Sequence, residues 1–99
     1  MKRIIDNEKR LDTLNNIVLN LDKDLTDLEN NLNEYYKLNN YYGSKNWLKD
    51  KEDFENGKIN NIKAGVLSED AVWNLDEDIN DLLIRMNKLI ELVNNKKEQ

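Results

Sequence analysis

Cysteine, histidine and proline are all absent from the 99-residue chain. Without cysteine there is no disulfide framework, no thiolate metal site and no cysteine nucleophile. Without histidine there is no imidazole base near neutral pH and no zinc site of the usual kinds. The three glycines lie too far apart to form a phosphate-binding loop. We therefore expect no catalytic residue, no metal ion and no cofactor.

Long apolar runs and a surplus of positive charge are missing too. The basic start is followed only by Ile4 and Ile5 before an acidic residue, so no signal peptide is expected. No stretch approaches the roughly 20 apolar residues of a membrane span. The formal net charge of −5 argues against direct nucleic-acid binding, which needs excess lysine and arginine. These features predict a cytoplasmic protein that contacts neither membrane nor nucleic acid.

An apolar heptad repeat runs through the first forty or so residues. Apolar side chains alternate at spacings of three and four, and neither glycine nor proline interrupts them. This pattern is typical of a helix that packs along one seam, and it predicts a single helix over about residues 3–42. The seam expected to form a dimer contact or core consists of Leu11, Leu14, Val18, Leu21, Leu25, Leu28 and Leu32.

A second heptad segment closes the sequence. Ser68 is a favourable N-cap, and the two acidic residues after it suit the positive end of the helix dipole. We predict a helix over about residues 69–94. Its apolar positions are Val72, Leu75, Ile79, Leu82, Met86, Leu89 and Val93.

The connector over about residues 43–67 breaks the heptad pattern. Gly43 is a helix-stop signal, and Ser44 is an N-cap for a short helix anchored by Trp47. We expect Gly65 to occupy a special backbone conformation that lets the chain turn into the last helix. The sequence thus predicts one all-α domain over residues 1–99, a long antiparallel helical hairpin with a structured connector.

The first predicted helix is longer than the second, so part of its seam would stay uncovered in a monomer. Long exposed leucine rows are unusual in soluble monomers. We therefore expect a homodimer that resembles a coiled coil or a four-helix bundle.

Two groups of side chains are candidates for partner binding. The first is an aromatic-rich end, whose alternative interpretation is that bulky rings close one end of the core. The second is an acidic face, whose alternative is a solvated helix surface, and it lacks the loop spacing of a calcium site. The aromatic group is Tyr41, Tyr42, Trp47 and Trp73, and the acidic group is Asp76, Glu77, Asp78 and Asp81.

The middle of the chain resembles a known family. The residues that carry the resemblance are Tyr41-Tyr42-Gly43-Ser44, then Trp47, Asp50, Glu52 and Gly57, then Lys63-Ala64-Gly65-Val66-Leu67-Ser68-Glu69-Asp70. This order is similar to domain-of-unknown-function family 4298, small proteins of Firmicutes and their mobile elements. The resemblance implies a helical protein whose most distinctive residues lie in the connector, and it implies no activity.

Two classes of function remain open on the sequence. The first is a non-enzymatic protein–protein interaction module that binds itself and another protein through helix faces or the aromatic end. The second is a mobile-element inhibitor or anti-defence factor, an acidic nucleic-acid mimic that occupies a basic groove of its target. The mimic should bind with steep salt dependence, whereas aromatic anchoring should tolerate salt.

Overall fold

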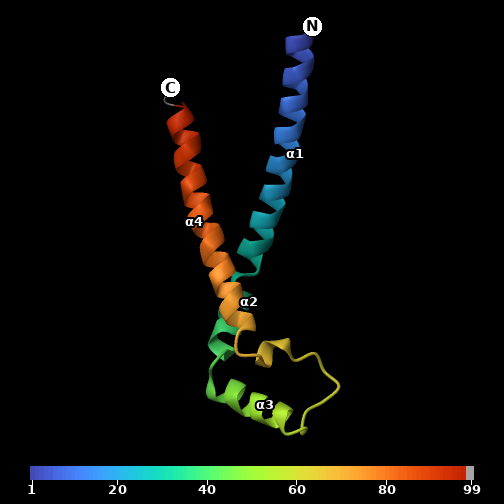
Figure 1. Cartoon of the computed structure of the whole chain (residues 1–99), viewed down its shortest axis with the longest axis vertical. Helices are drawn as coiled ribbons and strands as arrows, with labels where there is room; N and C mark the ends of the chain where they lie inside the picture. Colours follow the sequence, from blue (N-terminus) through green and yellow to red (C-terminus); the bar gives the residue numbers. More distant parts are fainter. Residues whose placement is uncertain (98–99) are drawn as a thin grey trace. The chain divides into compact units, whose positions relative to one another are not determined.

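The computed structural model describes residues 1–97 and contains no strand in that range. The elements are α1 (Lys2–Asn30), α2 (Leu32–Tyr41), α3 (Lys45–Glu55), the 3-10 turn η1 (Gly65–Leu67) and α4 (Ala71–Lys97), as Figure 1 shows. The all-α prediction is confirmed. The chain divides into two compact units, Met1–Lys37 and the part from Leu38 onward. The hairpin and the dimer remain predictions.

The first unit consists of α1 and the start of α2. Helix α1 has 29 residues and none of them is buried. At 1.5 Å per residue it is about 44 Å long. The heptad repeat is therefore carried on a helix, as the spacing predicts. No second element within this unit can cover the apolar stripe.

The structure differs from the predicted unbroken helix at Asn31, which separates α1 from α2. Its φ of −107° and ψ of 9° depart from helical values. The Asn31 side chain donates a hydrogen bond of 2.7 Å to the Asp27 carbonyl, and the Asn31 backbone N–H donates to the same carbonyl at 3.1 Å. A side-chain amide that bonds nearby backbone in this way competes with the regular helix ladder.

The second unit has a small core built by three elements. Trp47 from α3, Leu67 from η1 and Val72 from α4 are 6%, 7% and 3% exposed. The loop after α3 bends back so that η1 returns toward that helix (Figure 1). This core covers only the first turn of α4, and the rest of that helix extends beyond it.

Serine side chains bond the amides at the N-termini of α3 and α4. The Ser44 hydroxyl accepts from the Trp47 N–H at 3.2 Å, which confirms the predicted N-cap. The Ser68 hydroxyl accepts from the Ala71 N–H at 3.2 Å and donates to the Gly65 carbonyl at 2.8 Å. Helix α4 begins at Ala71, two residues later than predicted. Ser68 thereby ties η1 to the start of α4.

Glycine is required by the backbone at Gly57 but not at Gly65. Gly57 has a φ of +76°, and the Lys58 N–H donates to the Asp53 carbonyl at 2.8 Å across it. This is the Schellman ending of a helix, in which an L side chain is disfavoured. Gly65 has no such φ, and nothing lies within 4 Å of an added Cβ. The expectation of a special conformation at Gly65 is wrong.

We predict opposite effects of alanine at these two glycines. Gly57→Ala should lower the free energy of unfolding by about 1 kcal/mol, because an L residue in the left-handed region is strained. Gly65→Ala should leave the free energy of unfolding unchanged or raise it by about 0.5 kcal/mol, because the added methyl group restricts only the unfolded chain. Urea denaturation followed by circular dichroism measures both. Equal losses of stability would contradict the assignment.

Candidate functional site

The connector motif forms a cluster around the indole of Trp47. The ring N–H donates to the Val66 carbonyl at 2.9 Å and so joins α3 to the η1 segment. Tyr42 packs edge-on against the indole with ring centroids 5.2 Å apart. The Lys51 ammonium lies 5.2 Å from the same ring, within range of a cation–π contact. Together with Glu69, described next, these side chains form what we call the connector cluster.

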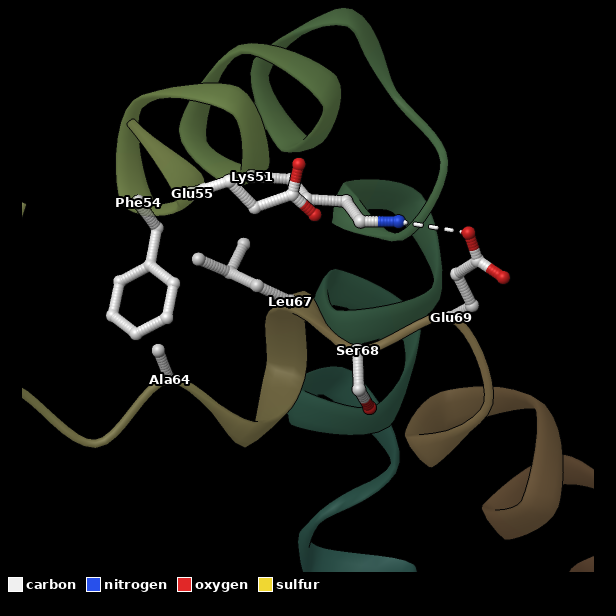
Figure 2. Close-up of a pocket in the computed structure, with 7 residues that line it drawn as sticks. All are labelled: Lys51, Phe54, Glu55, Ala64, Leu67, Ser68 and Glu69. Atoms are coloured by element: carbon white, nitrogen blue, oxygen red, sulfur yellow. Dashed lines mark hydrogen bonds and ion pairs between the residues drawn. The ribbon is translucent and has the colours of Figure 1, made fainter. Parts of the chain in front are cut away.

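Glu69, in the segment just before α4, is the last member of the connector cluster. Its backbone carbonyl accepts a hydrogen bond from the Tyr42 hydroxyl. Its carboxylate lies 3.1 Å from the Lys51 ammonium, the contact drawn as a dashed line in Figure 2. The Glu69 side chain is 85% exposed, and ion pairs of this kind add little stability. The cluster therefore holds the chain before α4 mainly through Trp47 and Tyr42.

Tyr41 makes a separate polar contact at the edge of the cluster. Its hydroxyl donates to the Asp50 carboxylate at 2.7 Å. This hydrogen bond, with partial burial and the negative charge of Asp50, raises the pKa of Tyr41 to about 12. The phenol is therefore neutral at physiological pH and acts as a donor that ties the end of α2 to α3.

A hollow of about 400 Å³ lies beside the cluster. Its lining residues are Lys51, Phe54, Glu55, Ala64, Leu67, Ser68 and Glu69. Figure 2 shows Phe54, Ala64 and Leu67 on one side and the Lys51–Glu69 pair on the other. The Ser68 hydroxyl already bonds two backbone groups, and no base activates it among these lining residues. The hollow offers a small apolar wall rather than an assembled acid–base site.

The structure brings together three of the four residues of the aromatic-rich end. Trp47 is buried, and Tyr41 and Tyr42 are half-buried with their hydroxyls bonded within the chain. Trp73 lies in the first turn of α4 and is 58% exposed. Trp73 is therefore largely in solvent, whereas Trp47 fills the core. Sequence reasoning missed Lys51, although its spacing of four from Trp47 places both on one helix face.

The acidic residues of α4 lie mostly in solvent. Glu77, Asp78 and Asp81 are exposed, and Asp76 is half-buried. Within the described residues, no group of three or more acidic side chains is placed to hold a metal ion. The stretch is therefore an exposed negative surface on the first half of α4.

A long exposed apolar surface follows the heptad rows. The seven seam residues of α1 and α2 are 38–63% exposed, from Leu32 to Val18. On α4, Leu75, Leu82, Met86, Leu89 and Val93 are exposed as well. We call these the apolar rows. They have the side-chain chemistry of a helix–helix interface. Among the described residues, no helix is both long and apolar enough to cross a membrane.

We predict that the two tryptophans differ sharply in their contribution to stability. Trp47→Phe removes the bond to the Val66 carbonyl and some packing, so the free energy of unfolding should fall by about 1–2 kcal/mol. The matched control Trp73→Phe alters an exposed ring and should change it by less than about 0.5 kcal/mol. Urea denaturation of both variants tests this, and a larger loss for Trp73→Phe would refute the core assignment of Trp47.

We also predict a pH effect at Tyr41. The folded chain holds this phenol neutral to about pH 12, whereas the unfolded phenol ionises near pH 10. The stabilisation is therefore complete below about pH 10 and disappears as the pH rises toward 12. Subtracting the ultraviolet phenolate titration of Tyr41→Phe from that of the unsubstituted chain isolates this group. In Asp50→Asn the same difference should move toward pH 10, and an unchanged midpoint would rule out Asp50 as the cause.

The chain matches the family described as Domain of unknown function (DUF4298) over residues 4–89, and it belongs to that family. The match extends the resemblance of the connector to most of both long helices. No curated protein and no solved structure matches the chain. Because the family description assigns no activity, function has to be inferred from the surfaces described above.

Proposed function

We propose that this member of the DUF4298 family is a non-enzymatic, cytoplasmic protein–protein interaction module. It acts through the apolar rows of α1 and α4, binding a second copy of itself and another protein. The observation that carries the proposal is the exposure of leucine-rich heptad positions along both long helices. Exposed apolar surface of this extent is the usual sign of a protein-binding surface.

The energetics support association through these rows. Full burial of a leucine side chain contributes about 1.5–3 kcal/mol. The row residues are about half exposed, so covering each one contributes about 1 kcal/mol. Association costs about 4–15 kcal/mol in lost motional freedom. The rows of α1 and α4 together are long enough to offset that cost, whereas a few scattered surface leucines are not.

The aromatic end supports the binding of another protein chiefly at Trp73. Tryptophan is enriched among the residues that dominate binding energy, and this ring is exposed at the start of α4. Trp47 has no free face of this kind. A partner-binding assay should therefore substitute Trp73, since a change at Trp47 would disturb the core.

The exposed carboxylates of Glu77, Asp78 and Asp81 favour a second candidate function. In it, the chain is an inhibitor or anti-defence factor from a mobile element, and its acidic face occupies a basic groove of a target protein as a nucleic acid would. Such binding weakens steeply as salt rises, because exposed charges are screened. Binding through the apolar rows should persist or strengthen in the same salt series.

The proposal predicts self-association at micromolar concentration. Light scattering after gel filtration should give a mass above the 11.8 kDa of one chain. Placing two charges in the seam with Leu14→Glu and Leu21→Glu should abolish association, because buried carboxylates without partners are costly. The matched control adds the same charges away from the seam, Asn16→Glu and Asn20→Glu, and should leave the mass unchanged. A mass of 11.8 kDa for the unsubstituted chain would refute self-association.

A further inference from the structure

We propose that a second copy of the chain covers the apolar rows in an antiparallel orientation, with α4 lying against the partner's α4 and α1 against the partner's α1. This inference rests on the proposed function and adds the direction and register in which the second copy pairs. The argument comes from the distribution of charge along each helix taken by itself.

Helix α4 is divided into two halves of opposite charge. Residues 71–83 contain four acidic side chains and no basic one, whereas residues 84–96 contain three basic side chains and one acidic. The acidic half holds Asp76, Glu77, Asp78 and Asp81, and the basic half holds Arg85, Lys88 and Lys96. All of these except the half-buried Asp76 are exposed. The sign changes between Asp81 and Arg85.

Helix α1 has a similar separation in the reverse order. Its basic residues gather near the N-terminus, and its acidic residues dominate toward the C-terminus. The basic group is Lys2, Arg3, Lys9 and Arg10, interspersed with Asp6, Glu8 and Asp12, and the acidic group is Asp22, Asp24, Asp27 and Glu29, interspersed with Lys23. The first group is weakly positive and the second strongly negative.

Antiparallel self-pairing sets opposite charges against each other on both helices. The acidic half of α4 then faces the basic half of the partner's α4, and the acidic end of α1 faces the basic end of the partner's α1. Parallel self-pairing would instead align acidic with acidic on each. An exposed ion pair contributes only about 0.2–1 kcal/mol. The apolar rows therefore provide the affinity, and the charges select the direction.

The same charges explain why a second copy suits these surfaces better than the chain's own other helix. In the antiparallel hairpin predicted from the sequence, the acidic end of α1 would meet the acidic half of α4. The basic ends of both helices would also meet. A second copy in the antiparallel orientation instead brings the acidic half of α4 to the basic half of the partner's α4, and the acidic end of α1 to the basic end of the partner's α1.

The apolar row of α4 fits this pairing in one register. In antiparallel coiled coils, the first seam position of the heptad on one helix packs against the second seam position on the other helix. Centring the pair on the change of charge sign near Ile84 sets Leu82 against the partner's Met86, Ile79 against the partner's Leu89 and Leu75 against the partner's Val93. The heptad repeat also permits registers shifted by seven residues, and the change of charge sign selects this one among them.

Disulfide trapping tests the direction without interference, because the chain has no cysteine of its own. Leu75→Cys and Val93→Cys are made as separate chains, one of which carries a mass tag. The two variants are mixed, allowed to exchange subunits and then oxidised gently. The antiparallel pair brings the two different positions together. We expect the mixed disulfide to exceed both self-disulfides by at least about tenfold, since bridging requires Cα atoms within about 7 Å.

The outcomes separate this inference from the proposed function. Ile79→Cys with Leu89→Cys repeats the test at a second layer, and Asn80→Cys with Asn87→Cys, outside the row, is the control that should show no preference. Predominant self-disulfides in a dimer would overturn the antiparallel orientation and leave the interaction module standing. A monomeric unsubstituted chain at the same concentration would overturn this inference together with the self-association in the proposed function, and would leave the binding of another protein to its own assay.

Discussion

A single α-helix cannot cover its own apolar stripe, and this constraint governs most of the molecule. The first unit is α1 with the start of α2, and it buries no side chain of α1. The second unit has a core of Trp47, Leu67 and Val72, which reaches only the start of α4. The chain therefore has far more heptad surface than its own units bury, and that excess is what the proposed partners would cover.

The connector has the opposite character, because its polar groups are largely engaged within the chain. Trp47 donates to the Val66 carbonyl, and Ser68 bridges the η1 turn and the first amide of α4. Together with the contacts of Tyr42 and Glu69, these bonds hold a stretch with little regular structure in one conformation. These bonds fix the segment before α4 to α3 and to the first turn of α4.

Sequence reasoning succeeded where a feature depends on local period or local capping. The spacing of three and four predicts the helical segments, and the predicted N-cap Ser44 is confirmed by its bond with the Trp47 N–H. It failed where a side chain competes with the backbone, as at Asn31, and where glycine has no special conformation, as at Gly65. The burial of Trp47 could not be read from spacing, because it depends on the η1 turn folding back onto α3.

The residues that carry the resemblance to the family and the residues proposed to bind partners are different sets. Tyr41, Tyr42 and Trp47 each make a particular hydrogen bond or packing contact within the second unit. The apolar rows require only leucine-like side chains at helical spacing, so many sequences would satisfy them. Such rows give affinity with little selectivity. In the proposed dimer selectivity would come from the charges that accompany the rows, and on α4 these change sign at the middle of the helix, which would favour one direction of pairing.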